Sequence, residues 1–563
     1  MNARRRCGVA GQTGAHPMSD TWWRGGVIYQ VYPRSFADSN DDGVGDLPGL
    51  TGKLDYIRAL GVDAIWISPF FRSPMKDFGY DVSDYRDVDP QFGHLEDFDR
   101  LVERAHALGL KVMIDQVLSH TSDQHAWFAE SRADRDNARA DWYVWAGPRT
   151  DGGPPTNWLS VFGGSAWQWD TRRRQYYLHN FLASQPDLNF HHPDVRRQMI
   201  DEVRFWLARG VDGLRFDACN FHFHDSRLRN NPPAKVARST LASIDNPYAL
   251  QQHRFDKTQP ENLEFLKQLR HLLDEYRAIG LGEVGDDDSL TTMARYTADG
   301  DKLHMVYSFD LLTSEFSAEH VRATVERMEA KLAEHGGKGW VCWSAGNHDV
   351  PRVVSRWGGD AAGPGFARLV LALIASLRGT PCLYQGEELG LPEADIPRER
   401  LRDPFGIEFW PRLKGRDGCR TPIPWKSNER YGGFSSSEPW LPMPDDHVAR
   451  AADLQHDDSA STLNFYRRFL GWRRRQRPLC EGSIRFHDAP EPTLAFERAS
   501  GADRRLLVFN LGASTQRWAL PGALAAQPCK DHGLVGASLA DRVVTLGPFS
   551  AWIGRVDDAH GIR

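Results

Sequence analysis

The sequence of 563 residues predicts an α/β fold: a (β/α)₈ TIM barrel with an inserted subdomain after its third strand and a C-terminal β-sandwich. Three observations support this prediction. A helix, a glycine and an apolar strand recur along the chain, three strand-like runs end on a carboxylate, and short alternating strands follow residue 478. Because barrels carry their active sites at the C-terminal strand ends, the three acids are expected to share one site.

The repeated unit is clearest at residues 60–66, 108–115 and 209–217, where a glycine ends the helix and an apolar strand follows at once. The eight predicted strands are 27–32, 62–66, 110–115, 211–217, 278–282, 305–309, 340–343 and 381–384. A doubly wound open sheet is the alternative architecture.

Two long connections are expected to wall the site. About 75 residues rich in Trp, Tyr, Gly and Pro separate Asp115 from a helix near Asp194, and a second excursion spans 385–440. The predicted divisions are a disordered tail (1–21), a catalytic barrel (22–118 and 194–477), an inserted subdomain called domain B (119–193), and a C-terminal β-sandwich (478–563).

Composition excludes several classes of partner. The net charge is −6 with charges of both signs, which favours neither nucleic acid nor a membrane surface and indicates a neutral ligand. Seven scattered cysteines suit free thiols in the cytoplasm. The longest apolar run, 369–377, is too short to cross a bilayer and predicts a buried helix. Residues 1–17 lack the apolar stretch of a secretory signal, so we expect a tail, with Met1 or Met18 as the true start.

The acids Asp217, Glu283 and Asp349 are the candidate catalytic residues. A retaining glycosidase needs a nucleophilic carboxylate and a protonated carboxyl roughly 5–5.5 Å apart, and Asp217 and Glu283 fit these roles. Arg215 shares a strand face with Asp217 and is expected to keep it ionised. Asp349 would hold sugar hydroxyls, and His120 is a further candidate for this. Any one of these acids alone would more often form a buried salt bridge.

The motifs at 213–217, 282–283 and 347–349 and the segment around His120 resemble the four signature regions of the α-amylase family, glycoside hydrolase family 13. The resemblance covers nearly all of residues 22–556, and 185–189 is similar to the fifth region of the oligo-1,6-glucosidase and α-glucosidase subgroup. It implies Asp217 as nucleophile, Glu283 as acid/base and Asp349 as transition-state stabiliser. It also implies a glucose subsite built from Asp77, Tyr80, His120, Phe181, Gln185, Arg215, His348 and Arg416, with Arg352 and Arg420 nearby.

A glycine-containing loop at 38–46 places oxygen ligands at every second position, as in a calcium loop. The expected ligands are Asp38, Asn40, Asp42, the Val44 carbonyl and Asp46. The alternative is an Asp/Gly turn without metal, but the loop also resembles the calcium loop of the same subgroup. We expect Ca²⁺ and no organic cofactor. The histidines in 222–225 indicate a loop packed on the barrel rim rather than a zinc site.

Two positions depart from the family pattern. Ser119 stands where asparagine usually precedes the histidine, and Ala218 stands where 1,6-cleaving members carry valine. A small residue there leaves room for an α-1,4-linked aglycone, so maltose-type substrates are favoured.

The leading hypothesis is a retaining, exo-acting α-glucosidase that hydrolyses maltose and short malto-oligosaccharides, with transfer to other hydroxyls as an extra activity. The alternatives on the same site are an oligo-1,6-glucosidase, a sucrose hydrolase or isomerase, and a trehalose synthase. From another class, the chain could be an inactive amylase-like partner subunit. The expected partners are small α-glucosides such as maltose, and the expected state is a monomer or homodimer.

Overall fold

The computed structural model describes residues 21–235, 245–359, 363–522 and 524–557, so the predicted tail lies, apart from Thr21, outside the described residues. Eight parallel strands form one sheet in the order β11-β10-β9-β5-β2-β1-β13-β12. A parallel bridge between Val306 and Val341 joins the two outer strands. The sheet is therefore a barrel, and the open-sheet alternative is wrong. The strands are β1 (Ile28–Val31), β2 (Ala64–Ile67), β5 (Lys111–Gln116), β9 (Gly213–Phe216), β10 (Ile279–Val284), β11 (Met305–Ser308), β12 (Cys342–Ser344) and β13 (Thr380–Tyr384).

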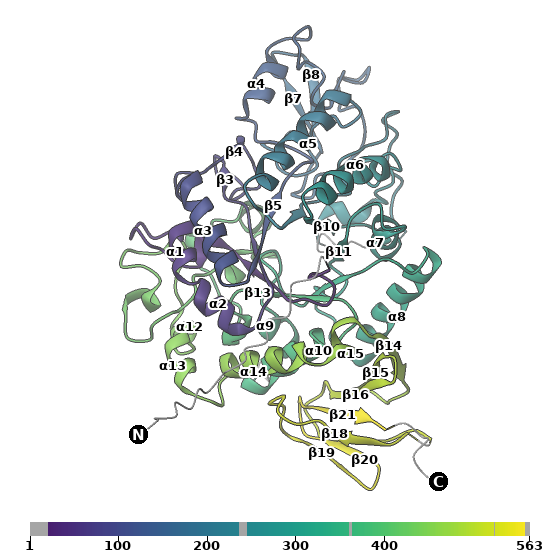
Figure 1. Ribbon diagram of the computed structural model, residues 1–563. Helices are drawn as coiled ribbons and strands as arrows, with labels where there is room; N and C mark the ends of the chain where they lie inside the picture. Colours follow the sequence, from purple (N-terminus) through teal and green to yellow (C-terminus); the bar gives the residue numbers. More distant parts are fainter. Residues whose placement is uncertain (1–20, 236–244, 360–362, 523, 558–563) are drawn as a thin grey trace, which may run out of the picture.

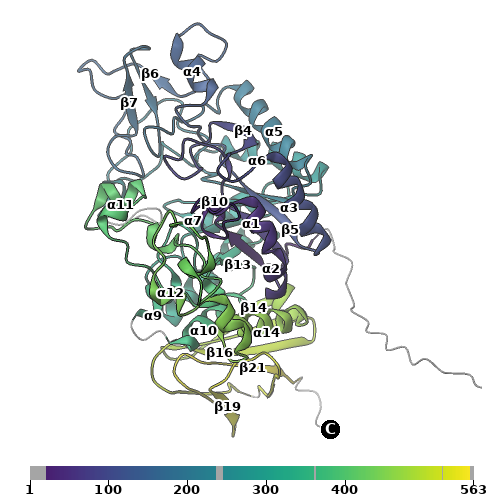
Figure 2. The ribbon, with the colours of Figure 1, turned by 90° about the vertical axis from the view of Figure 1, so that its left-hand side faces the viewer.

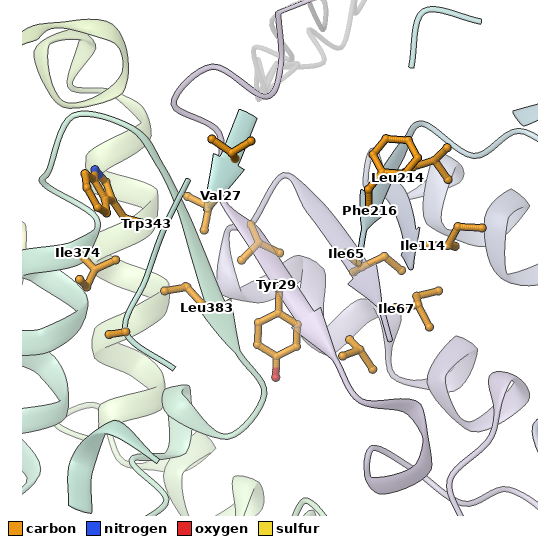
Figure 3. Close-up of a cluster of buried hydrophobic side chains, with 14 of the residues drawn as sticks. Val27, Tyr29, Ile65, Ile67, Ile114, Leu214, Phe216, Trp343, Ile374 and Leu383 are labelled. Atoms are coloured by element: carbon orange, nitrogen blue, oxygen red, sulfur yellow. The ribbon is translucent and has the colours of Figure 1, made fainter. Parts of the chain in front are cut away.

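Side chains that point into and out of the barrel alternate along each strand, and they form two separate apolar cores. Ile28, Trp66 and Met113 belong to the apolar cluster inside the barrel. Tyr29 and Ile65, which have the opposite parity, belong to the larger core outside it (Figure 3). Because successive side chains of a strand point to opposite faces, the parity of a residue decides which of these cores it joins.

Helices pack around the barrel (Figure 1). The main ones are α2 (Leu54–Leu60), α3 (Leu95–Ala107), α5 (Pro193–Leu207), α6 (Asn262–Glu275), α7 (Ser289–Thr297), α8 (Ala318–Glu334), α10 (Pro364–Ile374) and α14 (Thr462–Arg474). Gly61, Gly109 and Gly210 have φ values of 90°, 71° and 93°, the left-handed conformation expected where a helix stops and a strand begins. In the described part of the chain, none of the helices combines the length and apolarity needed to span a bilayer.

The connection from β5 to α5 contains α4 (Ala126–Ala133) and a small antiparallel sheet of β6 (Trp145–Ala146), β8 (Gln175–Leu178) and β7 (Trp167–Asp170). It has its own core around Trp158 and Trp167. The excursion after β13 contains α11 (Pro404–Phe409), which lies beside this segment in Figure 2. Phe162 and Phe405 meet with ring centroids 6.0 Å apart, so the two walls touch.

The C-terminal region consists of two antiparallel sheets that share a core around Val508, Trp518 and Val544, which confirms the β-sandwich. One sheet holds β14 (Ser483–His487), β15 (Thr493–Ser500), β16 (Asp503–Asn510), β21 (Ala551–Val556) and β18 (Ala526–Pro528), and the other holds β17 (Gln516–Ala519), β20 (Val543–Leu546) and β19 (Ala537–Ala540). The predicted domain boundaries remain predictions.

Candidate active site

Three acids meet at the C-terminal rim of the barrel. Asp217 directly follows β9, Glu283 lies in β10 beside it, and Asp349 lies in the loop after β12. Asp217 and Glu283 have the inward parity of their strands, so their side chains continue the inner layer above the apolar core. Their side chains are 11% and 7% exposed, and that of Asp349 is 21% exposed. The sequence-predicted acids are therefore gathered in one buried place that solvent still reaches.

Arg215 joins the acids from below. Its Nη1 lies 2.7 Å from Asp115 Oδ1 and 2.6 Å from Asp217 Oδ1, and its Nη2 lies 2.6 Å from Glu283 Oε1. The guanidinium is fully buried and also lies over the Trp66 ring, 5.1 Å from its centroid. One guanidinium cation therefore forms ion pairs with three carboxyl groups.

The electrostatics follow from this sharing. Burial raises the pKa of Asp217 and of Glu283 to about 7, and that of Asp115 to about 6, against the opposing charge of Arg215. The expectation that Arg215 keeps Asp217 ionised is therefore incomplete, because Arg215 shares its one positive charge among three carboxyl groups. Near neutral pH the Asp217 and Glu283 pair holds about one proton.

Three groups fix the Glu283 carboxyl. Arg215 forms an ion pair with Oε1, the Tyr307 hydroxyl donates to Oε1 over 2.9 Å, and the backbone N–H of Ala218 donates to Oε2 over 3.0 Å. Ala218 has φ of 41°, a left-handed turn directly after Asp217 that brings its N–H to Glu283.

Asp349 is held as an anion. Arg420 Nη2 lies 3.0 Å, and Arg416 Nη1 3.3 Å, from its Oδ1, and His348 Nε2 lies 3.3 Å from its Oδ2. Burial alone would raise the pKa of Asp349, but the positive charges of Arg416 and Arg420 hold the pKa of this carboxyl well below its usual range. Asp349 therefore differs from the other two acids in keeping its charge.

Histidine and tyrosine side chains line the site between these acids. Burial lowers the pKa of His348 to about 3, so the ring is neutral. Gln30 Nε2 lies 2.7 Å from its Nδ1, which leaves the proton on Nε2, facing the Tyr80 hydroxyl at 2.5 Å. His120 donates from Nε2 to the Tyr80 carbonyl over 3.1 Å. These rings are hydrogen-bonding groups, not acids, at neutral pH.

One end of the site is closed by ion pairs between two loops. Arg416 Nη2 lies 2.8 Å from Asp77 Oδ1 and 2.6 Å from Asp403 Oδ1. Gln185 donates to Asp77 Oδ2 over 3.1 Å, and the Phe162 ring covers Arg416. Asp77 follows β2 and Arg416 follows β13, so far-apart segments of the chain meet here.

The comparisons with known proteins agree with this architecture. A family model described as the catalytic domain of alpha amylase matches residues 30–482. The chain belongs to the α-amylase family. Members of this family are glycoside hydrolases, and the chain is an enzyme of that class.

Among α-amylase-family relatives, the chain is 52% identical to a "Probable alpha-glucosidase" of Rhizobium meliloti (strain 1021) over 95% of this chain and 97% of the relative. It is 33% identical to an oligo-1,6-glucosidase of Parageobacillus thermoglucosidasius over 90% and 93%. The crystal structure of an alpha-glucosyl transfer enzyme, XgtA, superposes with a TM-score of 0.93 at 57% identity, covering 95% of this chain and 99% of that one.

The remaining predicted subsite residues of this α-amylase-family enzyme fall into two groups. The Phe181 ring lies 5.1 Å from that of His120, and Arg420 Nε donates to the His348 carbonyl over 2.7 Å, so both belong to the site. Arg352 instead donates to the Gln385 carbonyl over 2.9 Å and lies over the Tyr384 ring. Its contacts are with the loop after β13, and the structure does not join it to the carboxylates.

Sequence reasoning missed Tyr307 and Asp403. Tyr307 had been placed only in a strand, although the register pairs it directly with Glu283. Asp403 lies in the long connection after β13, where no periodic sequence pattern identifies it. Its ion pair with Arg416 is what links it to the site. A sequence signal was available for Tyr307, whose parity is that of an inward residue.

The loop at 38–46 holds its oxygen atoms in local hydrogen bonds. Asp38 accepts backbone N–H bonds from Asn40 and Gly43, and Asp42 accepts one from Val44. Asp46 caps α1 (Leu47–Gly52) by accepting from Gly49. These oxygen atoms are engaged within the loop and at the helix start, and Ca²⁺ bound by Asp38, Asn40, Asp42, the Val44 carbonyl and Asp46 stays a prediction.

No group of three or more His, Cys, Asp or Glu side chains suited to a metal occurs within the ranges that the structure describes. His222 bonds to Asn262 Oδ1 over 2.9 Å and stacks on Phe190. His222 therefore packs between Asn262 and Phe190.

Proposed function

We propose that the chain is a retaining, exo-acting α-glucosidase that removes terminal α-1,4-linked glucose from maltose and short malto-oligosaccharides. The observation that carries this proposal is the shared guanidinium: Asp217 and Glu283 each lie 2.6 Å from neighbouring nitrogens of Arg215. Two carboxyls bridged in this way suit the short separation of retaining enzymes, roughly 5–5.5 Å.

In this mechanism Asp217 attacks the anomeric carbon while Glu283 gives its proton to the glycosidic oxygen, so that the aglycone leaves as an alcohol. The product is a glucosyl ester on Asp217. Glu283, now ionised, takes a proton from water, whose oxygen attacks the same carbon and frees Asp217. The anionic Asp349 binds sugar hydroxyls and favours the positive charge that develops in the transition state.

The closed end of the site supports exo action. Asp77 and Arg416 form a buried ion pair between two loops beside the acids, with side chains 6% and 15% exposed, and we infer that this pair limits the site to one terminal glucose. Asp77 and Arg416 would bind hydroxyls of that glucose, together with His120, Gln185 and His348.

Transfer of glucose to a second sugar or an alcohol belongs to the same proposal. Any hydroxyl that replaces water at the ester can accept the glucosyl group. The likeness to an alpha-glucosyl transfer enzyme favours this activity, and the small Ala218 beside Asp217 favours α-1,4 over α-1,6 linkages. An oligo-1,6-glucosidase, a sucrose hydrolase or isomerase and a trehalose synthase are the alternatives.

The test combines product analysis with trapping. We expect proton NMR to show α-glucose as the first sugar released from p-nitrophenyl α-glucoside, and we expect maltose to be used faster than isomaltose, sucrose and trehalose. Incubation with 5-fluoro-α-glucosyl fluoride should add one fluoroglucosyl group to the peptide that contains Asp217, and Asp217→Ala should take up none. First release of β-glucose, or a label on another residue, would refute the retaining assignment.

Two further expectations are proposals of the same kind. We propose structural Ca²⁺ in the loop at 38–46. We also propose a cytoplasmic location, which the free state of all six cysteines in the described residues supports.

A further inference from the structure

Tyr307 is a buried tyrosine that the mechanism above does not use. It lies in β11, directly opposite Glu283 of β10 in the strand register, and is 2% exposed. Because parallel strands in register place paired side chains on the same face, the phenol ring rises inside the barrel next to the Glu283 carboxyl. Trp66 and Phe309 pack beside the ring, at centroid distances of 6.1 and 6.4 Å.

The hydroxyl of Tyr307 has one donor partner and one acceptor partner, and both belong to the active site. Arg215 Nη2 lies 3.0 Å from it, and Glu283 Oε1 lies 2.9 Å from it. Since a guanidinium only donates, the Tyr307 oxygen accepts from Arg215, and its single proton is directed at Glu283. The direction of this hydrogen bond is therefore settled by chemistry.

This direction locates the proton of the protonated Glu283. Oε1 accepts the Tyr307 hydroxyl and lies 2.6 Å from the Arg215 Nη2 cation, so a proton on Oε1 would face two positively polarised groups. Oε2 lies away from that cation and accepts the Ala218 N–H at 3.0 Å. The acidic proton is therefore more stable on Oε2.

We propose that Tyr307 is a positioning residue: its hydroxyl holds the Glu283 carboxyl with the exchangeable proton on Oε2 and sets the pH above which that proton is lost. The proposal rests on the acid role of Glu283 proposed above. A hydroxyl donor stabilises the carboxylate more than the neutral acid, so it favours ionisation at lower pH.

Other groups around Glu283 act on the same equilibrium. Arg215 favours ionisation, whereas Asp217 on β9 and Asp349 after β12 oppose it. Asp115 on β5 and the Cys219 thiol also face this carboxyl. A change at Tyr307 that leaves these groups in place isolates the contribution of its hydroxyl.

The experiment compares Tyr307→Phe with Tyr29→Phe. Tyr29 is the matched control, because it is a buried barrel tyrosine whose hydroxyl donates to Glu388 over 2.9 Å, and Glu388 has no part in the proposed chemistry. In Tyr307→Phe we expect the alkaline limb of kcat/KM for maltose to move upward by about half to one pH unit, from the loss of one hydrogen bond to a carboxylate. We expect kcat to fall about tenfold or less, because only the positioning of the acid is affected. Tyr29→Phe should leave the pH profile unchanged.

A Tyr307→Phe profile that superposes on that of the unsubstituted enzyme, or an equal shift in Tyr29→Phe, would overturn the proposal. The variant Glu283→Gln distinguishes failure of the proposal for Tyr307 from failure of the proposed function. If that variant abolishes the alkaline limb, the limb reports Glu283 and the Tyr307 result stands by itself. If the limb persists in Glu283→Gln, the acid assignment is wrong, and the proposal for Tyr307 is overturned with it.

Discussion

Replacement of Arg416 by alanine should destabilise the enzyme by about 3–5 kcal/mol near neutral pH, the usual cost of removing one partner of a buried ion pair. Arg416 contacts Asp77 at 2.8 Å and Asp403 at 2.6 Å, and the side chains of these acids are only 6% and 0% exposed. Alanine would leave two buried carboxylates without their nearest counter-charge, with Arg420 as the remaining cation that acts on both. The two loops that Arg416 joins should separate, and KM for maltose should rise.

The loss should depend on pH in a defined direction. Although burial raises it, Arg416 holds the pKa of Asp403 below its usual range, so this pair stabilises the fold above the unfolded pKa and loses that effect in acid. In Arg416→Ala the charge of Arg420 and the backbone N–H of residue 416, 2.7 Å from Asp403, still favour the carboxylate, but the largest favourable contribution is lost, so the Asp403 pKa rises. The variant therefore gains less stability than the unsubstituted enzyme as pH rises through the unfolded pKa. The gap between the two proteins should be widest above about pH 5 and should narrow towards pH 4.

Urea unfolding at pH 7.5 and 4.5 measures this gap. The control is Lys414→Ala, which removes an exposed ion pair with Asp395, whose two side chains are 62% and 79% exposed, and which should change stability little at either pH. The stability of Arg416→Lys should lie between that of the unsubstituted enzyme and that of Arg416→Ala. Lysine keeps the positive charge but loses the bidentate geometry of the guanidinium. Equal midpoints for Arg416→Ala and Lys414→Ala at pH 7.5, or a gap that does not change with pH, would refute the reasoning.

Two further predictions concern the acid and the metal. Glu283→Gln should lower kcat/KM for maltose by about 10²–10⁴-fold, and by less for p-nitrophenyl α-glucoside, whose leaving group needs little protonation; equal losses on the two substrates would contradict the acid role. If Ca²⁺ occupies the loop at 38–46, saturation at a hundred times its Kd adds about 2.7 kcal/mol of stability, so EDTA should lower the melting temperature of the enzyme and leave that of Asp42→Ala unchanged. A melting temperature insensitive to EDTA would exclude a stabilising metal there.

The barrel could be predicted because its signals are local. Gly61, Gly109 and Gly210 each follow a helix, and a strand begins two or three residues later, so strand parity then places Arg215 inward. The contacts of Asp403 and Tyr307 could not be predicted in this way. Each depends on a partner from another strand or loop, and only the register and the path of the long excursion bring the partners together. Arg352 was likewise assigned by resemblance alone; its side chain donates to the Gln385 carbonyl, and its part in the subsite stays a prediction.

Asp115 explains why a site with one buried arginine can supply both a nucleophile and an acid. Asp115 accepts from Arg215 through Oδ1 and from Trp66 and Tyr80, each at 3.2 Å, through Oδ2. Burial raises the pKa of Asp115, but these three hydrogen bonds favour its ionised form, so its carboxylate offsets the charge of Arg215. The other two acids then face each other in a buried place with no net positive charge left over, and ionising both is unfavourable. They are left with one proton between them at neutral pH, which is the state in which one carboxyl can attack a sugar while the other protonates the leaving oxygen.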